Sequence, residues 1–504
     1  MLPLGLDRGP GGVSSQYAPH MELAASPRPV QPARTGSRRV QLLSVLTGVG
    51  TALFSLGLYG RFSSGYDLAI FTQAIRHYSR FQAPLVPVKG PDFTILGDHF
   101  HLILVVLAPL FWVWDDPRVL LLAQSALIAV SVPIVHRFAR RRLDPNPAFV
   151  LCVGYAIGWP LQAMAGFDFH EIAFGVPLIA WAVDSVDRRD DRRLLMAAGL
   201  LLFVREDLGM VVLMLGLLRC VRPPRRVGYA LVVIGLSAYV LTTAVILPHY
   251  SVTGRYGYWS YDSLGSSVPT ALRAAVEHPW RLIRLFFSPF EKTRTLLLLF
   301  APMALLSLRS RYCLLALPLL AERFLSSRET LWGTDYHYSA IVWPVVVLSA
   351  IDGAARLNLL RSRTFTWTWT ALPASFAVLG MLMAPSVFPM RGLFDGQVLR
   401  STGHQRAQQA AVREVPAGVC VIADDRMAVH FAIKDRVSLP GRLGRSADFT
   451  VVDLSRTVTG SGTPAPAEVM NQAQAHGDSV VYSAQQVVVL RSATFVGPTP
   501  ACRP

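Results

Sequence analysis

The sequence predicts an α-helical membrane protein with about eleven transmembrane spans and a small external α/β domain at its C-terminus. Long apolar blocks recur between residues 41 and 384, and 52% of the 504 residues are hydrophobic. Only 16% are charged, against roughly 25% in an average soluble domain. The mean hydropathy is +0.39. So much apolar surface requires the bilayer as its solvent, because a water-soluble core of this length cannot hide it.

The positive charge is distributed as in a multi-pass membrane protein. The net charge is +16, but arginines cluster in short loops between apolar blocks, at 137–142, 188–193 and 219–226. This distribution argues against nucleic acid as a partner. Short basic loops face the cytoplasm, so we expect a protein of the cytoplasmic membrane with its N-terminus inside and its C-terminal domain outside.

The chain divides into three predicted parts. Residues 1–38 are rich in Pro, Gly, Ser and Arg and are expected to form a disordered cytoplasmic tail. Residues 39–385 form the transmembrane domain, in which residues 41–60 read as an uncleaved signal anchor. The external first loop, 61–117, contains an amphipathic segment, 66–81, that is expected to lie in the membrane interface.

Residues 386–504 are predicted to form the external α/β domain. Four short segments rich in β-branched residues read as strands, at 418–423, 449–454, 479–482 and 487–490, and two segments read as helices, at 406–414 and 468–476. Cys420 and Cys502 lie in this domain and can form a disulfide if it is outside the cytoplasm. Whether they do so stays open from the sequence.

Five groups of polar residues fall at the outer face in this topology. They are Tyr66-Asp67, residues 97–101, residues 168–171, Arg205-Glu206-Asp207 and residues 335–337. Ionisable residues at membrane depth are costly and commonly functional. The triplet at 205–207 is the least easily explained by structure alone, because three consecutive charges interrupt an apolar run over 194–218.

Each group also has a structural interpretation. Asp67 can cap the helix that follows it. Asp168 and Glu171 lie at the expected start of a helix, where the helix dipole favours carboxylates. Asp98 and His99, together with His170, are candidate ligands of a divalent cation, but they can equally be solvated loop residues.

The polar motifs carry a resemblance to a known family. They are YDLAIFTQ at 66–73, DHFH at 98–101, DFHE at 168–171, VRED at 204–207 and DYHY at 335–338. With them, the chain resembles an uncharacterised family of predicted prokaryotic membrane proteins over most of residues 41–455. That family in turn resembles the GT-C superfamily of glycosyltransferases in its architecture.

The resemblance implies a function and a set of site residues. In GT-C enzymes an acidic residue early in the first external loop is the catalytic base, and this residue corresponds to Asp67. The sugar donor is a polyprenyl-phosphate-linked sugar, and membrane lipid is a further partner. The remaining candidates are Asp168 and Glu171 as catalytic residues, and Gln73, Arg205, Glu206, Asp207, Tyr336 and His337 as substrate-binding residues. An Asp-x-Asp pair is missing from the first loop, so a requirement for a divalent cation stays open.

The predicted reaction moves a sugar from a polyprenyl-phosphate donor to an acceptor on the outer face. Asp67 deprotonates the acceptor hydroxyl, and Arg205 grips the lipid phosphate because a guanidinium binds phosphate oxygens in a fork. Two other classes are compatible with the sequence: a lipid or small-molecule transporter or flippase, and a non-catalytic membrane scaffold. Gathering of Asp67, Asp168 and Arg205 around one outward cavity would favour the transferase.

Overall fold

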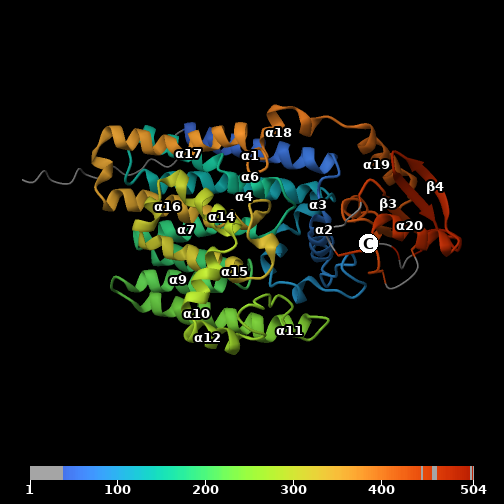
Figure 1. Cartoon of the computed structure of the whole chain (residues 1–504), viewed down its shortest axis with the longest axis horizontal. Helices are drawn as coiled ribbons and strands as arrows, with labels where there is room; N and C mark the ends of the chain where they lie inside the picture. Colours follow the sequence, from blue (N-terminus) through green and yellow to red (C-terminus); the bar gives the residue numbers. More distant parts are fainter. Residues whose placement is uncertain (1–37, 444–446, 457–461, 500–501, 503–504) are drawn as a thin grey trace, which may run out of the picture.

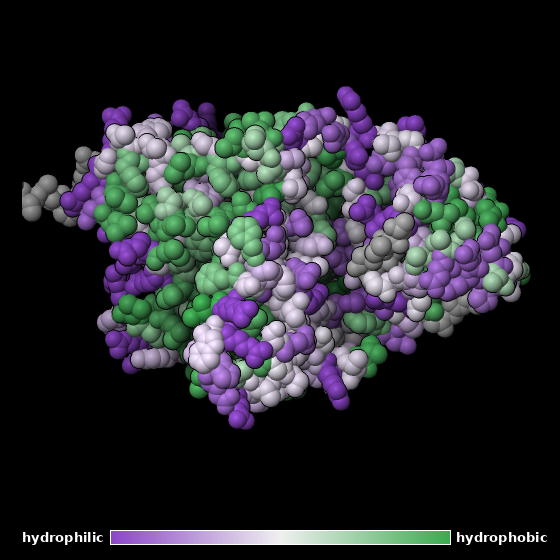
Figure 2. All heavy atoms as spheres, viewed as in Figure 1, coloured by the Kyte–Doolittle hydropathy of each residue, from purple (hydrophilic) through white to green (hydrophobic). Residues whose placement is uncertain are grey.

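The computed structural model describes residues 38–443, 447–456, 462–499 and 502. An elongated bundle of helices occupies one end of the molecule and a small sheet domain the other (Figure 1). Hydrophobic residues gather over the helical bundle, and most of the visible C-terminal domain is hydrophilic (Figure 2). The predicted disordered tail, 1–38, falls outside the described residues except for Arg38, which begins the first helix.

Five helical segments are long and apolar enough to cross a membrane. A further span is formed if two helices bent by 41° at a break are counted together. The five are α1 (Arg38–Gly60), α4 (Arg118–Ala139), α10 to α11 (Arg226–Leu241 and Leu247–Tyr250), His337–Arg356, which contains α16 (Val342–Arg356), and α17 (Arg363–Met383); the bent pair is α5 (Pro145–Ala156) and α6 (Trp159–Ala165). A multi-pass membrane protein is therefore supported, but the predicted count of eleven spans is not confirmed.

The other predicted spans correspond to shorter helices. They are α7 (Gly175–Arg188), α8 (Asp191–Leu201), α9 (Leu208–Cys220), α14 (Phe290–Phe300) and α15 (Ala316–Leu325), whereas α12 (Val268–Glu277) and α13 (Pro279–Phe287) lie in the long loop between α11 and α14. The apolar run 194–218 is split into α8 and α9 at the predicted place, around Arg205. One of the eleven predicted spans covers residues 294–308, and its helix is cut short because Ala304 and Leu305 adopt left-handed backbone conformations.

The arginine run after α4 is neutralised by acids from neighbouring helices. Arg137 and Arg141 bind Asp184 of α7 at 2.8 and 2.6 Å, and Arg142 binds Asp187 at 2.5 Å. Asp184 is buried. A buried charge must be paired to be tolerated, so the run predicted to mark the cytoplasmic face also ties α4 to α7.

The first loop, between α1 and α4, carries the helix α2 (Tyr66–Ser79), followed by the 3₁₀ turns η1 (Ile95–Gly97) and η2 (Leu102–Leu107) and by α3 (Leu110–Val113). Every residue of α2 from Leu68 to Arg76 is buried. The helix lies between the transmembrane helices and the C-terminal domain (Figure 1). The expected interfacial helix is thus covered by protein, and its apolar side chains share one core with the strands of the C-terminal domain.

The C-terminal domain contains a five-stranded sheet with the order β2-β1-β3-β5-β4. Its elements are α18 (Arg391–Phe394), α19 (Gly403–Glu414), β1 (Cys420–Ala423), β2 (Arg436–Ser438), β3 (Phe449–Asp453), α20 (Pro466–Ala475), β4 (Ser479–Ala484) and β5 (Val487–Arg491). Strands β2, β1 and β3 are parallel, and β5 pairs with β3 and β4 in antiparallel fashion. The predicted α/β domain, with its four strands and two helices, is confirmed. The three-residue strand β2 was not predicted.

Cys420 and Cys502 form a disulfide. It joins the first strand of the sheet to the end of the chain and resolves the alternative that the sequence left open.

Candidate active site

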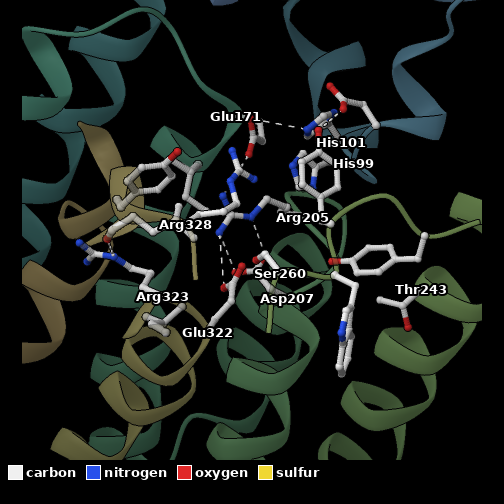
Figure 3. A pocket seen from close by; sticks show the side chains of 18 of the residues that line it. His99, His101, Glu171, Arg205, Asp207, Thr243, Ser260, Glu322, Arg323 and Arg328 are labelled. Atoms are coloured by element: carbon white, nitrogen blue, oxygen red, sulfur yellow. Dashed lines mark hydrogen bonds and ion pairs between the residues drawn. The ribbon is translucent and has the colours of Figure 1, made fainter. Parts of the chain in front are cut away.

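A cavity of about 690 Å³ lies between the first loop and the segments around and after α11 and α15. All five predicted polar groups contribute residues to its wall. These residues are Tyr66, Asp67, Asp98, His99, His101, His170, Glu171, Arg205, Asp207 and His337. Segments far apart in the sequence therefore converge on one site, and Figure 3 shows His99, Glu171, Arg205 and Glu322 around it.

Asp168 shapes this site without lining it. Its carboxylate accepts hydrogen bonds from the backbone N–H of Gly65 at 2.9 Å and of Leu68 at 3.1 Å. It therefore caps α2 from a distant part of the chain, since the first N–H groups of a helix have no partner within the helix. Burial, together with the nearby Asp67 carboxylate, raises the pKa of Asp168 to about 7.

Asp67 lies in the first turn of α2 and faces His170. The distance from its carboxylate oxygen to Nε2 of His170 is 3.6 Å. The other ring nitrogen, Nδ1, lies 3.1 Å from the carbonyl oxygen of Asp168, which accepts its proton and leaves Nε2 toward Asp67. Burial lowers the pKa of His170, but the Asp67 carboxylate outweighs it, so the net shift is upward. The ring of His170 stacks on His337 with centroids 3.7 Å apart.

Glu206 holds the tip of the first loop in place. Its two oxygens accept hydrogen bonds from Nδ1 of His99 at 2.7 Å and from the N–H of Phe100 at 3.1 Å. Asp98, next to His99, binds Lys89 at 2.8 Å and the hydroxyl of Tyr258. Burial alone would raise the pKa of Asp98, but Lys89 and His99 lower it to about 2. Glu206 does not line the cavity, so it acts on the site through His99.

Arg205 is surrounded by carboxylates. Its guanidinium forms a fork with Asp207 at 2.6 and 2.8 Å. Glu171 lies 3.7 Å away and Glu322 lies 3.9 Å away. Of the two acidic residues that follow Arg205, Asp207 thus contacts Arg205, whereas Glu206 contacts His99. The face of Arg205 that was expected to grip phosphate is already occupied.

Two other arginines in the wall have no carboxylate partner among the described residues. Arg323 donates to the carbonyl oxygens of Leu331 and Gly333 and to the hydroxyl of Ser339, all of which are neutral. The guanidinium of Arg328 lies 5.8 Å from the ring centre of Tyr258. The uncompensated positive charge of the cavity is therefore at Arg323 and Arg328.

Besides Glu206, two other predicted substrate-binding residues lie outside the cavity. Gln73 donates to the carbonyl of Val437 at 3.2 Å and accepts from the N–H of Val88 at 2.9 Å, so it joins α2 to the first loop and to the C-terminal domain. Tyr336 packs edge-on against Phe167. The next residue but one, Tyr338, lines the cavity instead.

The predicted cation ligands do not form a cluster. Asp98, His99 and His170 are engaged with Lys89, Glu206 and Asp67 respectively. Within the described part of the chain, one group of three possible ligands lies within 4.8 Å, namely Cys420, Asp448 and Cys502. Because its two cysteines are joined in the disulfide, this group does not offer the thiolates that a metal would need. Among the described residues, neither this group nor the three predicted ligands therefore offers a set of side chains that fits a divalent cation.

Comparison with known proteins identifies the family. A family model described as "Predicted membrane protein (DUF2079)" matches residues 58–457. The chain belongs to this family. The predicted membership of this chain in an uncharacterised family of membrane proteins is thereby confirmed.

The DUF2079 chain is also similar in structure to ArnT from Cupriavidus metallidurans. The crystal structure of ArnT bound to undecaprenyl phosphate is 13% identical in sequence, with a TM-score of 0.49, and the match covers 91% of this chain and 99% of ArnT. The apo structure of ArnT, also 13% identical, has a TM-score of 0.46, with 92% and 100% covered. No curated protein matches the sequence.

Proposed function

We propose that this chain is a membrane glycosyltransferase that moves a sugar from a polyprenyl-phosphate donor to a hydroxyl acceptor on the outer face of the cytoplasmic membrane. The observation that carries this proposal is that an available carboxylate and two guanidinium groups without a carboxylate partner among the described residues line the same cavity. Asp67 offers a carboxylate held by a single loose contact, and Arg323 and Arg328 offer positive charge that no carboxylate neutralises.

Asp67 is the proposed general base. The acceptor hydroxyl attacks the anomeric carbon of the donor sugar while Asp67 takes the hydroxyl proton. A new C–O bond forms, and the bond between the anomeric carbon and the phosphate oxygen breaks, so that the electron pair leaves with the lipid phosphate. A positioned base contributes roughly 10²–10⁴ in rate. Asp168 and His170 support this step indirectly, because one caps the helix that carries Asp67 and the other contacts its carboxylate.

Arg328 and Arg323 are the proposed partners of the leaving phosphate. Hydrogen bonds between guanidinium and phosphate are strong because both groups are charged. Arg205 is less suited, since its fork is filled by Asp207. Glu171 and Glu322, which contact Arg205 at 3.7 and 3.9 Å, also line the cavity and are the proposed acceptors of hydrogen bonds from sugar hydroxyls. Tyr256 and Trp259 line the same cavity and are proposed to pack against the sugar.

The proposed orientation places the cavity and the C-terminal domain outside the cytoplasm. Support comes from the disulfide between Cys420 and Cys502, because such bonds persist in oxidising compartments and are rare in the cytosol.

The test is a transfer assay with the purified full-length protein and a panel of polyprenyl-phosphate sugars. Mass spectrometry of lipids from a deletion strain selects the panel, because the donor is expected to accumulate. We expect Asp67→Asn to lower the rate by roughly 10²–10⁴. Asp92→Asn, an exposed carboxylate of the same loop, is expected to keep full activity. Full activity of Asp67→Asn would remove Asp67 as the base, and absence of transfer with every accumulated lipid would overturn the proposal.

A further inference from the structure

The helices α12 and α13 form an unpartnered surface on the outer side of the bundle. Neither contains a fully buried residue. They follow the candidate span that ends at Tyr250 and precede α14, which re-enters the bundle at Phe290. Figure 1 shows α12 at the lower edge of the view, below the label of α10.

The second helix, α13, has three distinct sides. Leu282, Leu285 and Phe286 are partly covered, and Phe286 packs against Phe324 of α15. A second side exposes large apolar groups, with Trp280 65%, Ile283 63% and Phe287 50% accessible. Spacings of three and four residues place these groups on one face of a helix.

The exposed apolar face continues onto α12. Leu272 is 62% and Val276 is 82% accessible, and they are spaced by one helical turn. Patches of exposed apolar side chains on this scale mark an interaction site or a membrane-contacting surface.

The polar side of α13 is basic. Arg281 and Arg284 are exposed and lie beside the apolar face. In the segment 268–290, Arg273 is paired with Glu277, which is the single acidic residue of the segment. An amphipathic helix with basic residues on its polar side is suited to an anionic lipid surface.

We infer that α12 and α13 dock onto the outer leaflet of the bilayer, with the apolar face of Leu272, Val276, Trp280, Ile283 and Phe287 among the acyl chains and with Arg281 and Arg284 at anionic headgroups. The bilayer is favoured over a protein partner because the segment is held beside the membrane at both ends. A candidate span ends at Tyr250 before the segment, and α14 of the helical bundle begins at Phe290 after it.

The docking has a consequence for the cavity. Ser267 and Val268, at the start of α12, line the cavity. A pair of helices that lies in the headgroup layer therefore brings this edge of the cavity to the depth at which a lipid-linked phosphate is found. This docking is a property of the surface and does not depend on the proposed transferase activity.

The test measures the depth of single residues in the full-length protein reconstituted in lipid nanodiscs. A nitroxide label is attached at Ile283→Cys and, as a matched control two residues away, at Arg281→Cys. The spectrum of the equally treated parent protein corrects for labelling of its own cysteines. Collision with oxygen, which concentrates among acyl chains, is compared with collision with a water-soluble nickel complex.

We expect the label at position 283 to collide preferentially with oxygen and the label at 281 with the nickel complex. Preference of the 283 label for the nickel complex would place the face in water, and protection from both reagents would place it under protein; either result overturns the inference. The label at 283 should also lie deeper when phosphatidylglycerol is added to phosphatidylcholine, and Arg281→Gln with Arg284→Gln should abolish this shift. Equal depth in both lipids would exclude the role of anionic headgroups.

Discussion

Nε2 of His170 lies 3.6 Å from the carboxylate of Asp67, and the opposite nitrogen of the same ring contacts the carbonyl oxygen of Asp168. Two residues of one turn, Asp168 and His170, thus contact both the helix that carries Asp67 and its carboxylate. This relationship links a structural cap to the proposed base.

The contact predicts a change in the titration of His170. The Asp67 carboxylate raises the pKa of His170 against the opposing effect of burial, because it stabilises the imidazolium. Asp67→Asn should therefore lower the pKa of His170. Nuclear magnetic resonance of histidine-labelled protein measures this shift, with His170→Phe to assign the signal. Asp92→Asn should leave the pKa unchanged, and an unchanged pKa in Asp67→Asn would contradict the contact.

The cap by Asp168 predicts a specific pH dependence of stability. Burial raises the pKa of Asp168 to about 7, above the value of about 3.9 expected in the unfolded chain. The folded state therefore binds the proton more tightly, and this group's contribution to stability falls as the pH rises from about 4 to about 7. Asp168→Asn stays neutral, so thermal unfolding at a series of pH values should show a flatter profile. A profile as steep as that of the parent would show that Asp168 does not titrate in this range.

Removal of the charge of Arg328 should weaken binding of the donor. A hydrogen bond to a charged group contributes about 1.5–3 kcal/mol, so Arg328→Gln should raise the KM for the donor by roughly 10- to 100-fold. Arg255→Gln is the matched control, because Arg255 is exposed in the loop after α11 and does not line the cavity. An equal effect of both variants would indicate general attraction of anions in place of a phosphate site.

Gly97 is required for close packing of the first loop. A Cβ at this position would lie 2.3 Å from the carbonyl oxygen of Tyr250, so Gly97→Ala must displace backbone on one side. Overpacking of this kind costs about 1–3 kcal/mol, and the melting temperature should fall. Gly257→Ala, where a Cβ meets nothing within 4 Å, should have little effect. Equal melting temperatures of the two variants would contradict the packing.

The sequence predicted most of what depends on local pattern. Hydropathy predicted a multi-pass membrane protein, and the alternation of β-branched residues predicted the strand at 449–454, which is β3 (Phe449–Asp453). The five polar groups that the sequence singled out all contribute residues to the cavity wall. The family resemblance pointed to Asp67, and the structure places it beside His170.

Contacts between distant parts of the chain were not predicted from the sequence. Asp168 looked like the cap of its own helix, but it caps α2, which begins about 100 residues earlier in the chain. Glu322 lines the cavity but was not among the predicted site residues, although Glu322-Arg323 interrupts an apolar stretch much as residues 205–207 interrupt theirs. The predicted count of eleven spans is not confirmed, because apolar content does not reveal breaks such as the left-handed pair Ala304-Leu305.

The C-terminal domain is connected to the wall of the cavity through the first loop. Ser438 donates to the carbonyl oxygen of Pro87, and Gln73 of α2 donates to that of Val437. Cys502 ties the last turn of the described chain to β1 of the same sheet. The wall of the cavity is therefore held by a sheet that is translated much later, since Gln73 and Val437 are separated by 364 residues. A protein truncated before the sheet would keep its candidate membrane spans but would lose the contacts that hold the first loop in place.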